Sequence, residues 1–491
     1  MDTLWSATYP LGPTGTGEFP TDARVDTVVA GAGLTGLATA VLLARSGQRV
    51  VVVEARRVGA VTTGRTAGKL SLLQGRTLSG IQHHHSPEVL RAYVEANREG
   101  QAWLVRQMDE RGVPYQRRDA YTYATTAAAI KDLRAEEEAC RTAGLDIEWT
   151  EETELPFAVG GALRLADQVQ LHPLRVLAML RDEFLERGGT IVEDCRVRGA
   201  DRSVPVTVTT TRGTLTADHL VLATGFPVLD RGGYFAKLVP ERSYVTAYRV
   251  PGDVPQGLYL SLDERVRSLR TLPGEDGQLL LVGGNGHVTG RSDSPAAAVA
   301  DLEAWTGQHF PGAERTHAWS AQDYRSINRL PFVGSMTRSR DAILFATGYA
   351  KWGMANGVAA ALNLAAHILD GKMSWADRLD QRAGVLSGIA PNARVAAEVT
   401  KDWVEAELTG LPDDPPAEGQ GVVGRGAKGL PEAMATVDGV TCRVSAVCTH
   451  LHGVVRWNDA EKSWDCPLHG SRFAADGKLL EGPAVDDLTR G

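Results

Sequence analysis

Four residues near the C-terminal end of the chain form a pattern that strongly constrains its fold. Cys448-Thr449-His450 is followed, after fifteen residues, by Cys466-Pro467-Leu468-His469. Thiolates and imidazoles are metal ligands, and here each short segment supplies one of each kind. A fold that uses all four ligands must carry two loops that meet around one centre. The pattern therefore predicts a small metal-binding domain built on two ligand-bearing loops.

The order of the ligands separates two kinds of metal site. Tetrahedral zinc also takes two Cys and two His, but zinc fingers pair Cys with Cys and His with His. In a Rieske [2Fe–2S] cluster one iron takes both thiolates and the other takes both imidazoles. We interpret Cys448, His450, Cys466 and His469 as ligands of a Rieske cluster, with zinc as the alternative. Ser471 follows the second loop, where its hydroxyl could donate a hydrogen bond to a bridging sulfide and tune the potential.

The C-terminal part of the chain resembles the Rieske ferredoxin fold, with one departure. Many Rieske proteins carry two further cysteines that form a disulfide between the cluster loops, and those positions read Gly453 and Leu468 here. The chain is in this respect similar to the disulfide-free, oxygenase-type clusters, and the resemblance implies a lower reduction potential. His452 lies close by, but the C-x-H spacing selects His450 as the ligand.

Composition excludes several classes of protein. A chain of 491 residues with 43% hydrophobic residues predicts about two or three domains, each able to bury a core. The net charge of −8 argues against nucleic acid or an anionic membrane surface as a partner. The cysteines outside the cluster motif show no disulfide-framework spacing, and the N-terminus does not read as a signal peptide. We expect a cytoplasmic protein without membrane-spanning segments.

The first folded segment carries a nucleotide-binding pattern. A predicted apolar strand from Val25 runs into Gly31-x-Gly33-x-x-Gly36 and then into a helix, and a second strand ends at Glu54. The glycines permit a tight turn, let a pyrophosphate approach the backbone and let helix and strand pack closely, while the acid accepts from ribose hydroxyls. The pattern predicts a dinucleotide-binding βαβ unit; the alternative is a glycine-rich turn in an ordinary βαβ unit.

Later segments favour FAD over NAD. Two further apolar strands end in Ala223-Thr224-Gly225 and Ala346-Thr347-Gly348, and the second leads into an alanine-rich helix near Gly353. The N-terminus of such a helix can stabilise the negative charge that builds on a flavin pyrimidine ring during reduction. The only other glycine cluster of note, residues 283–286, reads as a hairpin or turn, so we expect no NAD(P)H domain.

Together with the segment from Thr63 to Leu70, these motifs resemble flavoproteins of the D-amino-acid-oxidase and sarcosine-oxidase superfamily over residues 25–370, and in particular bacterial members with a C-terminal Rieske domain. The resemblance implies an α/β fold: a Rossmann-like FAD-binding domain, an inserted mixed β-sheet substrate domain and a small all-β Rieske domain. It also implies the residues that surround FAD: Gly31, Gly33, Leu34, Thr35, Gly36, Glu54, Ala55, Arg56, Thr63, Gly64, Arg65, Ala67, Gly68, Lys69, Leu70, Val197, Ala223, Thr224, Gly225, Gly348, Lys351, Trp352, Gly353 and Met354.

The expected domain boundaries follow from these segments. Residues 1–410 should form the flavoprotein part, with FAD-binding elements at about 25–80, 190–230 and 340–370 and substrate-domain segments between them. A Pro- and Gly-rich linker is predicted over 411–430 and the Rieske domain over 431–491. Residues 392–408 read as an amphipathic helix that connects the two parts.

Substrate contacts are expected from the inserted sheet and the last flavin turn. Our candidates for catalytic residues are Tyr244, His287, Tyr324, Arg325, Lys351 and Trp352. Arg242 and Arg325 could clamp a carboxylate bidentately, although solvent-exposed positions are the alternative for both. Residues 83–85, all histidine, read as a solvated loop rather than a metal site.

The resemblance implies a flavin-dependent dehydrogenase or oxidase acting on a small amine or amino-acid-like substrate. Hydride would pass to N5 of FAD, and single electrons would leave through the Rieske cluster to an acceptor protein or to O₂. Two alternatives stay open. In one, an external donor reduces the cluster and the flavin then reduces or oxygenates a small molecule. In the other, the chain is a non-enzymatic redox relay or sensor. The sequence does not determine the oligomeric state.

Overall fold

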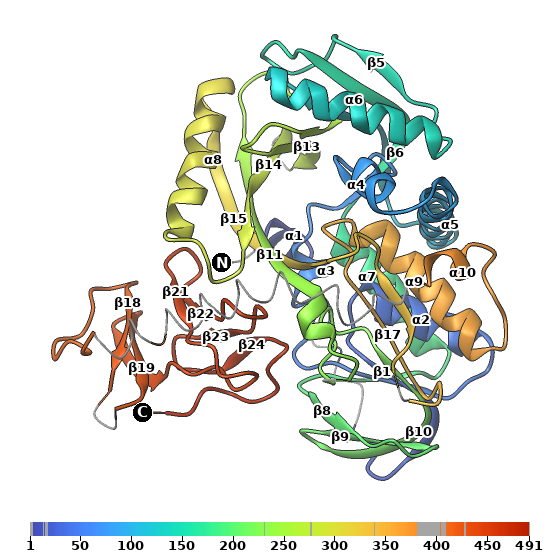
Figure 1. The fold of residues 1–491 in the computed structure, drawn as a ribbon, viewed down its shortest axis with the longest axis vertical. Coiled ribbons are helices and arrows are strands. Elements are labelled where there is room, and N and C mark those ends of the chain that lie inside the picture. The colour runs from blue at the N-terminus through green and yellow to red at the C-terminus, as the bar shows by residue number, and fades with distance from the viewer. Residues whose placement is uncertain are drawn as a thin grey trace.

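The computed structural model describes residues 3–490 except for 13, 15–17, 230, 275–276, 338, 381–402, 404–408 and 427–428. The helix predicted over 392–408 therefore lies outside the described residues, apart from Trp403. Figure 1 shows three parts: a nucleotide-binding domain, a large twisted sheet beside it and a small β domain formed by the C-terminal residues. The expected fold class, a Rossmann-like domain with an inserted mixed sheet and an all-β Rieske-type domain, is confirmed.

The nucleotide-binding domain is built on a mainly parallel sheet. Its strand order is β16-β17-β10-β1-β2-β7, and the antiparallel β8 and β9 extend from β10. The strands β2 and β17 are almost wholly apolar and buried, and β1 is so over its last three residues, as expected of a parallel sheet buried on both faces. Their bounds are β1 Arg24–Ala30, β2 Val50–Val53, β7 Thr190–Val192, β8 Val197–Ala200, β9 Val206–Thr210, β10 Gly213–Leu222, β16 Phe332–Ser335 and β17 Ile343–Thr347.

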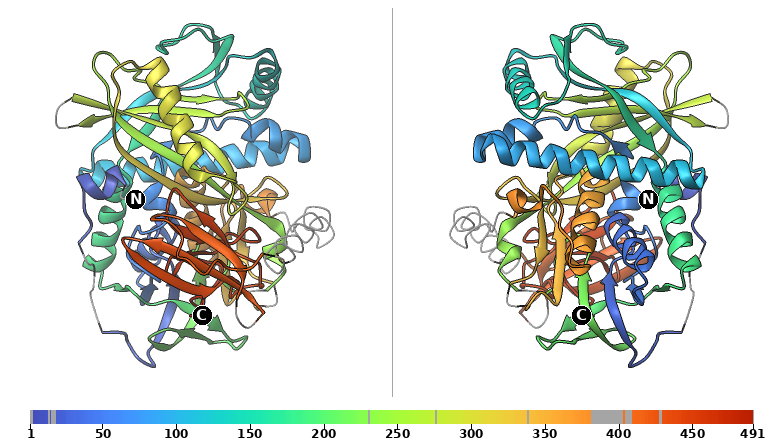
Figure 2. Two further views of the ribbon diagram at one scale, coloured as in Figure 1. Left: turned by 90° about the vertical axis from the view of Figure 1, so that its left-hand side faces the viewer. Right: turned by 90° about the vertical axis from the view of Figure 1, so that its right-hand side faces the viewer.

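Helices pack on this sheet and on one another. The helix α2 contacts both α7 and α9, and α9 also lies along the long helix α5. Figure 2 shows α5 crossing the molecule between the nucleotide-binding domain and the substrate sheet. The bounds are α1 Leu4–Thr8, α2 Leu34–Arg45, α3 Thr62–Arg65, α5 Pro87–Arg111, α7 Pro173–Glu186, α9 Gly353–Ile368 and α10 Ala376–Leu379.

The inserted domain is a mixed nine-stranded sheet of order β15-β11-β14-β13-β12-β4-β6-β3, with β5 paired to β6. Only β12 and β4 run parallel. The bounds are β3 Lys69–Leu70, β4 Tyr115–Ala124, β5 Glu148–Thr150, β6 Gly161–Leu171, β11 Leu238–Arg249, β12 Leu258–Ser261, β13 Arg267–Gly274, β14 Gly277–Val288 and β15 Glu314–Ser326; the remaining elements are α4 Thr77–His84, α6 Ala127–Thr142, α8 Pro295–His309 and the 3₁₀ helix η1 Tyr234–Lys237.

Two sequence expectations differ here from the structure. His83 and His84 are not in a loop, because they form the last turn of α4, and His85 lies within hydrogen-bond distance of the Asn328 carbonyl oxygen, 2.6 Å from its Nε2. Residues 283–286 form no turn or hairpin, because they belong to β14. The glycines in this segment lack a Cβ and so let neighbouring atoms lie close to the strand. A Cβ at Gly284 would lie 2.2 Å from the Val266 carbonyl oxygen.

The C-terminal domain consists of a three-stranded and a four-stranded antiparallel sheet. Trp464 and Phe473 are fully buried in its core, which also contains Cys448 and Cys466. The strand β18 lies inside the range predicted as linker and pairs with β19. The bounds are β18 Gly421–Arg425, β19 Pro431–Val437, β20 Val440–Ser445, β21 Arg456–Asn458, β22 Ser463–Asp465, β23 Arg472–Ala474 and β24 Leu479–Glu481.

The small domain packs against both larger parts (Figures 1 and 2). Asp459 accepts hydrogen bonds from Ser294 and from the Ala296 amide, and so satisfies the N-terminal turn of α8. Two glycines allow the closest approaches. A Cβ at Gly290 would lie 2.7 Å from the Pro467 nitrogen, and one at Gly470 would lie 2.6 Å from the Pro240 Cβ. Each of the two parts thus contributes a glycine whose missing side chain lets a proline of the other part approach closely. None of the helices in the described part of the chain has the length and apolar character that a membrane crossing requires.

Candidate active site and metal centre

A cavity of about 940 Å³ lies between the parallel sheet and the inserted sheet. All three parts of the molecule contribute to its wall, including Leu480, Glu481 and Gly482 from the C-terminal domain. The predicted FAD-binding residues that line it are Gly31, Gly33, Leu34, Thr35, Glu54, Ala55, Arg56, Thr63, Arg65, Ala67, Lys69, Val197, Ala223, Thr224, Gly225, Lys351, Trp352, Gly353 and Met354. The cavity therefore collects segments that are far apart in the sequence.

The other predicted FAD-binding residues do not line the cavity. A Cβ at Gly36 would lie 1.9 Å from the Gly31 carbonyl oxygen, so this glycine permits the close packing of helix on strand that the motif requires. A Cβ at Gly64 would likewise lie 1.9 Å from the Gly59 carbonyl oxygen, and one at Gly68 would lie 2.5 Å from the Leu171 carbonyl oxygen. Leu70 is buried in the main core, and Gly348 turns the chain with φ of +84°. These five residues shape the cavity from behind its wall.

The end of β2 supplies the acidic residue of the nucleotide motif. Glu54 is 8% exposed, and its carboxylate accepts from the amides of Ala32 and Arg56 at 2.8 and 2.9 Å. Burial raises the pKa of this carboxyl, while the two amides oppose the rise. The carboxylate is thereby held at the cavity wall beside the glycine turn, where a ribose is expected.

The segment after α3 is held by donors from three other elements. The indole N–H of Trp319 donates to the Arg65 carbonyl, and the indole N–H of Trp5 donates to the Thr66 carbonyl. The guanidinium of Arg270 donates to the next two carbonyls, those of Ala67 and Gly68. Burial lowers the pKa of Arg270 to about 9, because carbonyls rather than a carboxylate surround it. Lys69 follows, with its ammonium bonded to the Tyr259 carbonyl and Ser268 Oγ, and burial lowers its pKa to about 7.

All six predicted catalytic residues line the cavity: Tyr244, His287, Tyr324, Arg325, Lys351 and Trp352. Tyr244 and His287 form one unit on β11 and β14, with Tyr244 Oη 3.0 Å from His287 Nε2. His287 Nδ1 lies 2.9 Å from the Val288 carbonyl oxygen, which can only accept. This assigns the proton to Nδ1, so Nε2 accepts from the Tyr244 hydroxyl. Burial lowers the pKa of His287, which keeps the imidazole neutral.

Arg242 and Arg325 do not form the predicted clamp for a substrate carboxylate, because both are paired with acidic residues of the protein. Arg325 Nε donates to Glu241 at 2.8 Å, and Lys351 Nζ lies 3.7 Å from the same carboxylate. Burial alone would raise the pKa of Glu241, but Lys351 and Arg325 outweigh it and lower the pKa. Asp323 accepts from the Lys351 amide beside this group, and burial raises its pKa to about 6. The cavity thus presents a balanced cluster of acids and bases rather than an isolated cation.

The two cluster loops lie where the sequence places them. Residues 448–453 connect β20 to β21, and residues 466–471 connect β22 to β23. A backbone hydrogen bond closes each loop. The Cys448 amide donates to the Gly453 carbonyl in the first loop, and the Cys466 amide donates to the Ser471 carbonyl in the second. The pKa of Cys448 is lowered to about 7, mainly by its bond with Cys466, with further help from the His450 amide and the Ser471 hydroxyl. The thiols form one pair.

The imidazoles form a second pair, with ring centroids of His450 and His469 5.1 Å apart. His469 is 6% exposed, and its Nδ1 is buried without a hydrogen-bond partner among the described residues. Burial lowers the pKa of His469 to about 3, so the ring is neutral and can act as a ligand. In the described part of the chain no three potential ligands close around one point, as a single zinc ion would need. Separate thiol and imidazole pairs suit a two-iron cluster.

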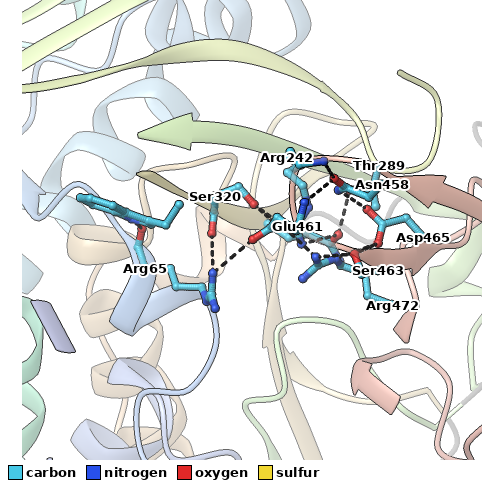
Figure 3. Close-up of polar contacts among 12 residues, drawn as sticks. Arg65, Arg242, Thr289, Ser320, Asn458, Glu461, Ser463, Asp465 and Arg472 are labelled. Atoms are coloured by element: carbon cyan, nitrogen blue, oxygen red, sulfur yellow. Dashed lines mark hydrogen bonds and ion pairs between the residues drawn. The ribbon is translucent and has the colours of Figure 1, made fainter. Parts of the chain in front are cut away.

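A buried group of charged residues joins this domain to the flavoprotein part (Figure 3). Arg242 on β11 is fully buried; it donates to Glu461 at 2.5 Å and to Glu481 at 2.9 Å, both in the C-terminal domain. Arg472 bonds Glu461 and also Asp465, the residue that precedes Cys466. Arg242 is therefore neither a substrate clamp nor solvent-exposed, because its charge is used between the domains. The charged group reaches the base of the second cluster loop.

Sequence reasoning missed the residues that lie between the cavity and the cluster. Gln322 donates to the Gly470 carbonyl at 2.8 Å and to Tyr324 Oη at 2.9 Å. Phe226 has its ring centroid 5.3 Å from that of Tyr324 and 6.3 Å from those of His450 and His469. Neither residue belongs to a motif. The position of Phe226 directly after Ala223-Thr224-Gly225 was the only available signal.

A cavity built by a dinucleotide-binding sheet, together with paired Cys and His loops, defines a flavoprotein with an iron–sulfur domain. Comparisons with known proteins agree. Residues 26–367 match the FAD dependent oxidoreductase family and residues 422–490 match the Rieske [2Fe-2S] domain. The Rieske 2Fe-2S iron-sulfur protein YhfW of Bacillus subtilis is 31% identical over 99% of this chain and 97% of its own.

Solved structures share the fold of the flavoprotein part. Glycine oxidase from Geobacillus kaustophilus covers 74% of this chain and all of its own, with a TM-score of 0.62 and 20% identity. L-Proline dehydrogenase from P. horikoshii covers the same share and 98% of its own chain, with a TM-score of 0.60 and 15% identity. The chain belongs to the FAD dependent oxidoreductase family and carries a C-terminal Rieske domain. It is an oxidoreductase with FAD and a Rieske [2Fe–2S] cluster as cofactors.

Proposed function

We propose that this oxidoreductase dehydrogenates a small amine or amino-acid-like molecule and releases the electrons through its Rieske cluster. Bound FAD supplies a hydride acceptor for the C–H bond next to nitrogen, and the cluster supplies a one-electron exit. The substrate class is supported by the fold shared with glycine oxidase and L-proline dehydrogenase. The cavity wall formed jointly by the FAD-binding residues and the Rieske domain is the observation that carries the proposal.

The Tyr244–His287 pair gives the cavity a place for an amine. The Tyr244 hydroxyl hydrogen is directed to His287 Nε2, so the lone pairs of Tyr244 Oη are available to accept an N–H from the substrate. His287 is neutral because its pKa is lowered, so its Nε2 keeps accepting from the Tyr244 hydroxyl. The pair would therefore hold a primary or secondary amine through one of its N–H groups.

Charged residues next to this pair would orient the rest of the substrate. Glu241, Arg325 and Lys351 form a paired group at the cavity wall, and Lys351 retains a half-exposed side chain. A substrate carboxylate would compete with Glu241 for these cations, whereas a second amine would compete with the cations for Glu241. Both zwitterionic and diamine substrates thus belong in a substrate screen.

The proposal is tested by anaerobic stopped-flow absorbance with a panel of amines, diamines and amino acids. We expect one class of compound to bleach the flavin first and the cluster bands afterwards. Tyr244→Phe should slow flavin bleaching at least about tenfold and remove the His287 ionisation from its pH profile, while Tyr121→Phe, a tyrosine outside the cavity wall, should not. Failure of every compound to reduce the flavin, or flavin reduction that never reaches the cluster, would reject the proposal.

Electron flow in the opposite direction is the second candidate, and the absent inter-loop cysteines at Gly453 and Leu468 favour it through the lower potential they imply. In the same experiment this direction predicts that only an external one-electron donor bleaches the cluster, with the flavin following. A non-enzymatic relay is disfavoured, because titratable candidates such as His287, Arg325 and Lys351 line the same cavity as the FAD-binding residues.

A further inference from the structure

Phe226 lies directly between the cavity wall and the imidazole side of the cluster site. It follows Thr224 and Gly225, which line the cavity, and it is 2% exposed. On the opposite side its ring centroid lies 6.3 Å from both cluster histidines, His450 and His469. A single aromatic ring therefore fills the space between the flavin-binding loop and the two ligands of one iron.

The local backbone holds this ring in place. Thr224 Oγ1 donates to the Phe226 carbonyl at 2.5 Å, and Thr347 from the neighbouring strand donates to the Gly225 carbonyl. Tyr324 packs edge-on against the ring, with centroids 5.3 Å apart and planes at 68°. Since these contacts come from the loop after β10 and from β15 and β17, the position of Phe226 is set by the flavoprotein part and not by the Rieske domain.

A second connection runs beside the ring. Gln322 donates to the carbonyl of Gly470, the residue after His469, and also to Tyr324 Oη, while the cavity-lining Gly482 carbonyl accepts from Tyr324 Oη at 3.4 Å. The thiol pair, by contrast, lies in the core of the Rieske domain. The histidine pair thus faces the flavin site and the cysteine pair faces away from it, so a cluster held here would take its imidazole ligands from the side nearer the cavity.

We propose that Phe226 is the contact through which the flavin site and the Rieske cluster exchange electrons, with Gln322 and Tyr324 positioning the two sides. The proposal rests on the function proposed above. Electron tunnelling weakens steeply with distance and weakens further across a void, so a close-packed ring at this point sets the rate. The Phe226 ring lies 6.3 Å, between centroids, from each imidazole and 5.3 Å from the ring of Tyr324, which lines the cavity.

The electrons balance as follows. Reduced flavin gives up two electrons and one proton in total, and the cluster holds one electron at a time. The first electron converts the diferric cluster to its Fe(II)/Fe(III) form, which passes that electron to an external one-electron acceptor, a redox protein or O₂. The oxidised cluster then takes the second electron, and the proton leaves to water.

The test needs no substrate. Protein loaded with FAD and cluster is fully reduced with dithionite, freed of excess reductant and mixed anaerobically with ferricyanide, and flavin and cluster absorbance are followed. We expect Phe226→Ala to slow flavin reoxidation by about tenfold or more, because a void replaces the ring. The EPR spectrum of the reduced cluster and the iron and flavin contents should stay as in the wild type. If Phe226→Ala loses the cluster, Phe226→Leu carries the same test with the same two outcomes.

Phe235 provides a matched control, because its ring also lies against His469, at 5.6 Å, but none of its chain neighbours lines the cavity, whereas Thr224 and Gly225 directly before Phe226 do. Phe235→Ala should reoxidise its flavin at the wild-type rate. A cluster-free Cys466→Ser variant gives the rate of direct flavin oxidation by ferricyanide. Wild-type rates in Phe226→Ala and Phe226→Leu would overturn the role of Phe226 and leave the proposed function intact. A wild-type protein that reoxidises its flavin no faster than Cys466→Ser would reject the proposed function itself.

Discussion

Replacement of Glu461 by glutamine would show how strongly the buried charges hold the Rieske domain on the flavoprotein part. The Glu461 side chain is 5% exposed and bonds arginines from both sides of the interface. The charges in this group balance, because three arginines form ion pairs with three acidic residues. The arginines are Arg65, Arg242 and Arg472, and the acids are Glu461, Asp465 and Glu481. Glutamine keeps the shape of the side chain but leaves one positive charge in excess where water cannot screen it.

Two independent arguments give a similar magnitude for this change. Removing one partner of a buried ion pair costs about 3–5 kcal/mol. Burial raises the pKa of Glu461, but Arg472, Arg242 and Arg65 outweigh it and lower the pKa from 4.5 to about 2. At about 1.4 kcal/mol per unit, this shift corresponds to about 3 kcal/mol of stability at neutral pH. We expect Glu461→Gln to lower the free energy of unfolding by about 3 kcal/mol.

The pH dependence gives the result that would refute this reasoning. Because the pKa is lowered in the folded protein, the contribution is complete above 4.5 and is lost as the pH falls toward 2. Chemical denaturation followed by tryptophan fluorescence should show the difference between wild type and variant shrinking by about 1.4 kcal/mol between pH 6 and pH 3.5. The control Glu186→Gln removes an exposed ion pair with Arg111 and should cost less than about 0.5 kcal/mol. Equal stabilities at neutral pH, or a difference independent of pH, would contradict the argument.

Two further changes test the cofactor sites. Gly36→Ala should abolish FAD retention, measured as flavin content after purification, because its Cβ would lie 1.9 Å from the Gly31 carbonyl oxygen. Gly307→Ala, with no atom within 4 Å of the new Cβ and away from the cavity wall, should retain the flavin. Ser471→Ala removes the hydroxyl that bonds Cys448 and should lower the midpoint potential of the cluster, followed by EPR during redox titration, by on the order of 50 mV. Thr449→Val, whose wild-type hydroxyl bonds the Asp486 carbonyl instead, should leave the potential unchanged.

The parts of the site that sequence alone could predict are those where chemistry demands a spacing. The cluster ligands and the glycine turn belong to this class, because a metal pair and a pyrophosphate each accept few residue types at few separations. The six catalytic candidates line the cavity as expected, since they lie on the inserted sheet and the last flavin turn. Their hydrogen-bond partners could not be predicted, because the pairing of Tyr244 with His287 depends on the register of β11 against β14.

Arg242 shows why the domain interface could not be predicted. An arginine on a strand reads equally well as exposed or as a substrate clamp, and its actual partners, Glu461 and Glu481, follow it by 219 and 239 residues. No local pattern links residues so far apart. The same holds for Phe226, which looks like an ordinary core residue after a strand until the Rieske loops are placed against it.

Gly453 and Leu468 depart from the disulfide-bearing pattern together, and the structure gives a physical reason. A Cβ at Gly453 would lie 2.7 Å from Leu468 Cδ1 and 3.1 Å from Cys466 Sγ. The leucine side chain therefore occupies the space beside the thiol pair that any side chain at 453 would need. We expect Gly453→Ala alone to lose iron on purification, and Gly453→Ala combined with Leu468→Ala to retain it, because the smaller residue vacates that space. Iron content and the EPR spectrum of the reduced protein measure both. Full iron content in the single variant would show that the leucine moves aside freely, and that the two departures are independent of one another.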